Sequence, residues 1–141
     1  TSEHRGIATL TRSSMFNMNN QIDYLHAQND TVISIFIIED KKGVDALDQI
    51  SELEGLDVIF IGLYDLSQSL GFKGDVDNIE FVNLFNNLLK KISKTNLAVG
   101  TYAPNAERAI EMIEMGVTFI TVNVDGAMLR TSYENLINKI R

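Results

Sequence analysis

The chain has 141 residues, of which 45% are hydrophobic and 22% charged, and it carries a formal net charge of −7 and no cysteine. This composition is ordinary for a globular protein with an apolar core. The excess of acid disfavours nucleic acid as a partner, because such binding relies on Lys and Arg to neutralise phosphates. The lack of cysteine excludes disulfides, thiol catalysis and zinc–thiolate sites, and it suits a cytoplasmic protein.

The apolar runs of the sequence are too short to span a membrane, so we expect no membrane partner. Asp, Asn or Lys interrupts each run before it reaches the roughly 18 residues of a membrane-spanning helix. The first residues, Thr1 to Arg5, contain no basic stretch followed by an apolar one. We therefore expect no signal peptide within this sequence.

Apolar segments alternate with segments of helical periodicity along the chain. In chain order we predict a helix over 22–27, a strand over 32–38, a helix over 44–53, a strand over 58–61, a helix over 79–92, a strand over 97–99, a helix over 109–113, a strand over 119–122 and a helix over 129–140. The strand segments are continuously apolar and β-branched, which is typical of strands covered on both faces in a parallel sheet. Alternation of strands and helices predicts βαβ units and a parallel α/β fold.

Carboxylates follow three of the four predicted strands. Glu39 and Asp40 follow the first strand, Asp65 the second and Asp125 the fourth. The carboxyl ends of parallel strands carry the reactive groups in α/β folds, and carboxylate oxygens suit a hard cation such as Mg²⁺ or Mn²⁺. Acids after strands are also common as helix caps or first-turn residues. Spacing alone leaves both interpretations open.

A longer pattern spans the second predicted strand. Residues 55–67 read GLDVIFIGLYDLS, Gly71 closes the pattern, and Ile37-Ile38-Glu39 precedes it. This pattern resembles the HpcH/HpaI family of class II, metal-dependent aldolases, in the citrate lyase-like superfamily. There Q-I-E is followed by G-V-D-x-(I/V)-F-(I/V)-G-P-x-D-L-(S/A)-x-x-x-G. Arg5-Gly6, Gly100 and the segment 116–125 fit the same family.

The resemblance covers nearly the whole chain and implies a fold. The four βα units would be the C-terminal half of a (βα)₈ TIM barrel, since about eight strands close a barrel of this class. Residues 1–141 would then form a single partial domain, with the N-terminal half of the barrel absent from this chain.

The resemblance also implies site residues. Glu39 and Asp65 would bind a divalent metal, Mg²⁺ or Mn²⁺, and Gly62, Tyr64 and Asp65 would bind an α-keto acid, pyruvate or oxaloacetate. Backbone N–H groups near Tyr64 and Asp65 would receive the substrate carboxylate, and Gly62, without a Cβ, would let the backbone approach it.

The catalytic residues stay unassigned. The family's general base, a His paired with an Asp, and its enolate-binding Arg belong to the first half of the barrel. His4 and His26 do not stand in that context. We expect His26 to lie on a helix surface or to pack, and His4 and Arg5 to support the pocket or an interface.

Departures from the family pattern cluster at the expected site. Ile37 replaces a Gln, Leu63 and Tyr64 replace a Pro and a small residue, and Asn123 replaces a Gly. They bear on the substrate more than on the metal. The leading hypothesis is a carbon–carbon lyase or aldolase acting on a chelated α-keto acid.

Two alternatives stay open. One is condensation of oxaloacetate with acetyl-CoA to citrate on the same barrel, as in siderophore biosynthesis. The other is a non-catalytic α/β module. The resemblance further implies a homo-oligomer.

Overall fold

The computed structural model of the chain describes residues 11–12, 16, 23, 27 and 30–141, and it divides into two units, residues 1–33 and 34–141. In the first unit the described residues Asp23, Ala27 and Thr31 are helical, and the Thr31 hydroxyl donates a 2.8 Å hydrogen bond to the carbonyl of Ala27. The rest of the predicted helix over 22–27, together with His4, Arg5, Gly6 and His26, lies outside the described residues.

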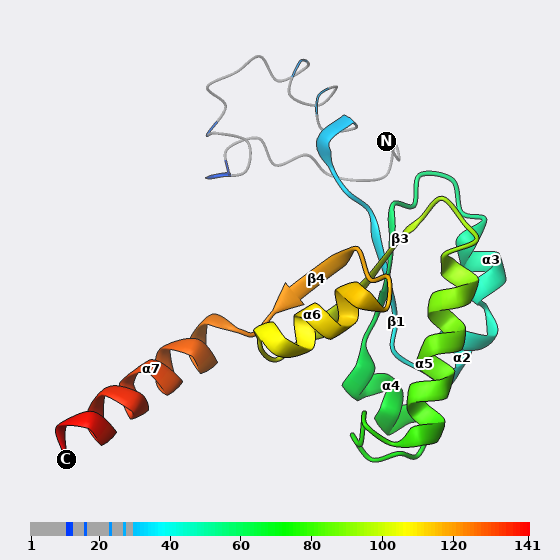
Figure 1. Cartoon of the computed structure of the whole chain (residues 1–141). Coiled ribbons are helices and arrows are strands. Elements are labelled where there is room, and N and C mark those ends of the chain that lie inside the picture. The colour runs from blue at the N-terminus through cyan, green and yellow to red at the C-terminus, as the bar shows by residue number, and fades with distance from the viewer. Residues whose placement is uncertain (1–10, 13–15, 17–22, 24–26, 28–29) are drawn as a thin grey trace. The chain divides into compact units, whose positions relative to one another are not determined.

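The second unit is built on a parallel sheet of four strands in the order β1-β2-β3-β4 (Figure 1). The strands are β1 (Ile35–Ile38), β2 (Val58–Ile61), β3 (Ala98–Ala103) and β4 (Phe119–Val122). Helices occupy every crossover, so the predicted parallel α/β fold is confirmed.

Two strand predictions were wrong at their ends. Residues 32–34 do not join β1, because the carbonyl of Ser34 accepts bonds from the N–H groups of both Asp57 and Val58 at 3.1 Å, and the Ser34 N–H donates to the Asp57 carboxylate at 2.7 Å. These bonds anchor the loop instead of extending the ladder. β3 continues beyond the predicted 97–99 to Ala103, and the Thr101 hydroxyl ties it to the carbonyl of Ile61 at 2.8 Å.

The helices are α2 (Lys41–Asp45), α3 (Leu47–Ser51), α4 (Leu63–Ser69), α5 (Ile79–Ile92), α6 (Ala106–Glu114) and α7 (Asp125–Ile140). The predicted helix over 44–53 is two short helices that meet at Ala46, and it begins earlier because Asp40 caps α2 through a 2.7 Å bond from the N–H of Gly43. The helix predicted over 109–113 also begins earlier, at the Asn105 cap.

The core lies between one face of the sheet and the helices. Its fully buried members include Ile38, Ile59, Ile61, Leu66, Phe81, Ile92 and Met112. On the other face Ile35 and Ile37 are 42% and 52% exposed. Coverage of both faces, expected from the apolar strands, is therefore not found within residues 34–141. That uncovered face carries the candidate site.

The last helix, α7, extends beyond β4 in Figure 1 and has no buried residue along its length. Leu129, Tyr133, Leu136, Ile137 and Ile140 are all exposed. In the described part of the chain, every helix is too short or too polar to cross a lipid bilayer.

Candidate active site

The uncovered face of the sheet ends in a row of three residues at its carboxyl edge. The register pairs Ile38 with Ile61 and Ile61 with Thr101, so the next positions, Glu39, Gly62 and Tyr102, lie side by side. Side chains alternate along a strand, which places these residues on the same face as Ile37. The surroundings of Gly62 agree with this placement. A Cβ at Gly62 would lie 3.3 Å from the Cβ of Glu39 and 3.7 Å from Cγ2 of Ile37.

Gly62 keeps the centre of this row open. It is the N-cap position of α4 and offers no side-chain cap, with φ at −80°, a value that any residue can adopt. The glycine is therefore required for space and not for its backbone angle. The N–H groups of Leu63, Tyr64 and Asp65 point out of the first turn of α4 without an intrahelical acceptor, as at every helix start.

The Glu39 and Asp65 carboxylates lie at the ends of adjacent strands, Glu39 directly after β1 and Asp65 in the first turn of α4. Both residues are exposed, and neither carboxylate has a hydrogen bond or an ion pair to any described residue. The other acids after strands differ. Asp40 caps α2, and the Asp125 carboxylate accepts a 2.7 Å bond from the N–H of Gly126. The capping interpretation is thus confirmed for Asp40, while Asp125 is a first-turn acid.

These two carboxylates suit a hard divalent cation. Within the described residues no group of three or more His, Cys, Asp or Glu side chains converges. Mg²⁺ is commonly held by one or two carboxylates, with water and substrate oxygens in the other positions.

Two tyrosines border the row. The rings of Tyr64 and Tyr102 pack edge to face, with centroids 6.2 Å apart. Tyr64 was expected at the site, whereas Tyr102 was not, because the predicted strand stopped at residue 99. Its spacing of two from Gly100 would have placed it on the site face had the strand been extended.

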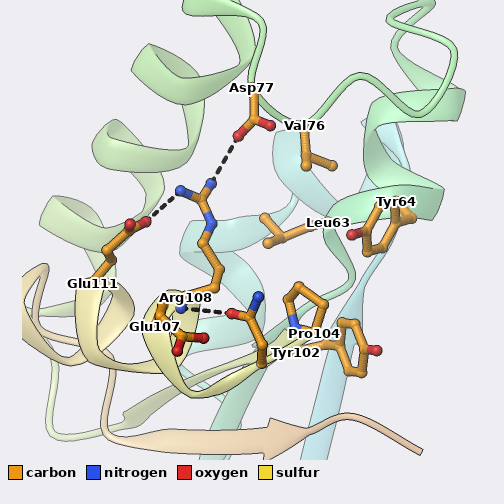
Figure 2. A pocket seen from close by; sticks show the side chains of 10 residues that line it. Leu63, Tyr64, Val76, Asp77, Tyr102, Pro104, Glu107, Arg108 and Glu111 are labelled. Atoms are coloured by element: carbon orange, nitrogen blue, oxygen red, sulfur yellow. Dashed lines mark hydrogen bonds and ion pairs between the residues drawn. The ribbon is translucent and has the colours of Figure 1, made fainter. Parts of the chain in front are cut away.

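Beyond the tyrosines lies a cavity of about 250 Å³ between α4 and α6. Figure 2 shows Arg108 of α6 on one side and the two tyrosines on the other, with Leu63 and Pro104 between them. The Arg108 guanidinium pairs with Asp77 at 3.2 Å and with Glu111 at 2.6 Å. Sequence reasoning did not find this cavity, because its walls come from three separate segments of the chain.

A family model described as HpcH/HpaI aldolase/citrate lyase matches residues 2–132. Among curated proteins, the chain is 28% identical over 137 residues to a 5-keto-4-deoxy-D-glucarate aldolase of Shigella boydii serotype 18, covering 97% of this chain and 52% of the relative. It is 32% identical over 133 residues to a 4-hydroxy-2-oxo-heptane-1,7-dioate aldolase of Salmonella paratyphi B, covering 94% and 50%. The chain spans about half the length of these relatives.

Solved structures of similar fold include a member of the same family. A family protein of Burkholderia cenocepacia J2315, described as an HpcH/HpaI aldolase/citrate lyase, superposes with a TM-score of 0.83 at 31% identity, over 97% of this chain and 52% of that chain. The citrate synthase SbnG superposes with a TM-score of 0.70 at 28% identity, over 84% and 49%.

Proposed function

The chain belongs to the HpcH/HpaI aldolase/citrate lyase family, and from this premise we propose that it supplies the metal-binding half of an aldolase that makes or breaks a carbon–carbon bond next to the carbonyl of an α-keto acid. The observation that carries the proposal is the pair of carboxylates, Glu39 directly after β1 and Asp65 in the first turn of α4 after β2, neither of which has a partner among the described residues. In (βα)₈ barrels the reactive groups come from the carboxyl ends of several different strands.

The uncovered face of the sheet supports the proposal of a half-barrel architecture. Ile35 and Ile37 leave about half of their surface exposed there, and Phe60 and Phe119 are only partly buried. In a (βα)₈ barrel this face would point inward and pack against the strands of the opposite half. We propose that a preceding half of similar length supplies those strands and, with them, the general base.

The roles of the chain's residues are then distinct. Glu39 and Asp65 hold a divalent metal, Mg²⁺ or Mn²⁺, which when bound polarises the keto oxygen and stabilises the enolate of the substrate. The N–H groups of Tyr64 and Asp65 in the first turn of α4 bind the substrate carboxylate, because uncapped amides favour negative charge. Gly62 lets the substrate lie against the backbone.

Two measurements on the full-length protein test this proposal. The first is binding of Mn²⁺ followed by electron paramagnetic resonance, and the second is metal-dependent exchange of the pyruvate C3 protons for deuterium followed by NMR. We expect Glu39→Gln and Asp65→Asn each to weaken Mn²⁺ binding by at least tenfold and to abolish exchange. Each change removes one charged oxygen ligand and hardly alters the shape of the side chain.

Asp40→Asn is the matched control, because it neutralises the carboxylate next to Glu39 while Asn still caps α2. It should leave Mn²⁺ binding and proton exchange within twofold of the parent protein. If Glu39→Gln behaves like Asp40→Asn, the metal assignment is wrong. If the parent protein binds no metal and exchanges no proton, the non-catalytic module becomes the better account.

A second candidate function is favoured by the likeness to citrate synthase SbnG. In that reaction oxaloacetate would condense with the methyl carbon of acetyl-CoA to give citrate. Mass spectrometry of products formed from oxaloacetate and Mg²⁺, with and without acetyl-CoA, separates the two candidates. Citrate formed only with acetyl-CoA supports the synthase, whereas pyruvate formed in both samples faster than with Mg²⁺ alone supports the aldolase.

A homo-oligomer and a cytoplasmic location complete the proposal. The oligomer rests on the family resemblance. The location rests on the absence of cysteine.

A further inference from the structure

The peptide group between Ile61 and Gly62 joins the end of β2 to the candidate site, and its two polar groups are bonded to the strands on either side. The N–H of Gly62 donates a 3.0 Å hydrogen bond to the carbonyl of Ile38, the last residue of β1. The carbonyl of Ile61 accepts a 2.8 Å hydrogen bond from the hydroxyl of Thr101 in β3. Because a peptide group is planar, the two bonds together fix its orientation.

Gly62 depends on such outside restraint, because it has no Cβ and its backbone can adopt more conformations than that of any other residue. Its φ of −80° and ψ of 85° belong neither to the strand before it nor to the helix after it. The carbonyl of Gly62 accepts a 2.9 Å bond from the N–H of Leu66, the first helical bond of α4. The orientation of Gly62 therefore sets the direction of the first turn of α4, which contains Asp65.

The same line of bonds reaches the second carboxylate. The carbonyl of Ile38 is part of the peptide group that Ile38 shares with Glu39, so it moves together with the backbone of Glu39. The hydroxyl of Thr101 is thus connected, through the peptide before Gly62, to the backbone on which each carboxylate is mounted.

Thr101 is a polar residue in an apolar place. It is fully buried, and Val99 and Ala103, two residues before and after it in β3, are buried apolar side chains on the same face. A buried hydroxyl gives up its bonds to water, so one bond to a carbonyl leaves little net gain in stability over a valine of the same shape. Packing alone gives no reason for a hydroxyl here, whereas the orientation of the neighbouring peptide does.

We infer that Thr101 is a positioning residue of the proposed metal site. Its hydroxyl holds the Ile61–Gly62 peptide in one orientation, and that orientation sets Asp65 at its place relative to Glu39. The inference rests on the proposed function and adds to it a residue whose side chain lies on the opposite face of the sheet from Glu39. Thr101 therefore acts on the metal through the backbone and touches neither metal nor substrate.

Thr101→Val in the full-length protein tests the first step, because it removes the hydroxyl and keeps the shape of the side chain. In metal-free protein labelled with ¹⁵N-glycine, NMR follows hydrogen exchange of single glycine amides. Exchange at Gly62 should become about fivefold faster, the equivalent of one lost hydrogen bond. The amide of Gly116, which bonds to the carbonyl of Ile113 at the end of α6, should exchange at the rate of the parent protein.

The second step is measured as Mn²⁺ binding by electron paramagnetic resonance. In Thr101→Val the affinity for Mn²⁺ should fall about fivefold, and the spectrum of bound Mn²⁺ should broaden because its ligands are held less uniformly. Thr101→Ser keeps the hydroxyl and should restore both the affinity and the Gly62 exchange rate. Thr118→Val is the matched control, because the Thr118 hydroxyl bonds the backbone of Val99 near the other end of β3, at 3.3 and 3.4 Å. It should change neither measurement.

Unchanged exchange at Gly62 in Thr101→Val would overturn the inference, and so would faster exchange with unchanged Mn²⁺ affinity. If Thr101→Val does not fold, Thr101→Ser and Thr101→Ala form a second pair that differs in one hydroxyl, and equal results in this pair would overturn the inference. A parent protein that binds no Mn²⁺ would instead overturn the proposed function, while exchange at Gly62 would still show whether Thr101 holds the peptide.

Discussion

At the level of single residues, Gly62 lies between Glu39, the proposed metal ligand, and the aromatic residue Tyr102 on one face of the sheet. Its φ of −80° makes no demand for glycine. Glycine is required here by the neighbouring side chain, because a Cβ at position 62 would lie 3.3 Å from the Cβ of Glu39. A side chain at this position would thus move Glu39, the proposed metal ligand, before it affected the backbone.

Gly62→Ala should therefore weaken Mn²⁺ binding several-fold while lowering the free energy of unfolding by less than about 1 kcal/mol, in the range of a small surface change. Isothermal titration with Mn²⁺ and urea unfolding measure the two effects separately. Gly55→Ala is the opposite case. Nothing lies within 4 Å of its Cβ, but φ is +76°, so it should cost about 1 kcal/mol of stability and leave metal affinity unchanged. Equal metal affinity in both variants would contradict this account of Gly62.

At the level of elements, an aromatic pair from β2 and β4 packs across a glycine of β3. The rings of Phe60 and Phe119 meet edge to face, with centroids 6.3 Å apart, above Gly100 of β3. A Cβ at Gly100 would lie 2.8 Å from the ring of Phe60 and 3.1 Å from that of Phe119. Rings cannot yield as the tip of a flexible side chain can, so the strands themselves would have to shift.

Gly100→Ala should lower the free energy of unfolding by about 1–3 kcal/mol, the usual cost of overpacking. Gly126→Ala is its control, because this glycine lies in α7 with nothing within 4 Å of its Cβ. Alanine is the better helix former, so that change should be neutral or stabilising. Urea unfolding measures the free energy of unfolding of both variants. An equal loss of stability in the two would show that the Phe60–Phe119 contact is not the cause.

At the level of the whole molecule, the uncovered face of the sheet within residues 34–141 is an apolar surface, which a folded partner segment covers in the proposed half-barrel. The sheet also has two open edges, β1 and β4, in the described part of the chain. Exposed apolar strands with open edges favour association.

The 141-residue chain on its own should self-associate, as measured by analytical ultracentrifugation. Ile37→Lys should reduce this association, because it places a charge on the uncovered face. Ile79→Lys is the control, since Ile79 is 70% exposed but begins α5 on the covered side. A monomeric chain, or equal effects of both variants, would argue against the half-barrel proposal.

The sequence by itself determined the fold class, the family resemblance and the two candidate metal ligands of this protein. These features depend on local signals: continuous β-branched runs, helical periodicity and a motif that spans a strand end. Such signals can be recognised without knowing which distant residues pack against them. Glu39 and Asp65 could be named because each matches a position of the family motif. Their places after strands agree with that assignment, since parallel strands bring their carboxyl ends to one edge.

Only the tertiary structure decided what depends on residues distant in the sequence. The register placed Tyr102 beside Gly62, and the packing of rings explained why residue 100 is glycine. The capping bond of Asp40 distinguished that acid from its neighbour Glu39. The cavity at Arg108 arises from segments that meet only when the crossovers fold back onto the sheet. Such contacts are set by how strands and helices pack, and no window of the sequence contains both of their partners.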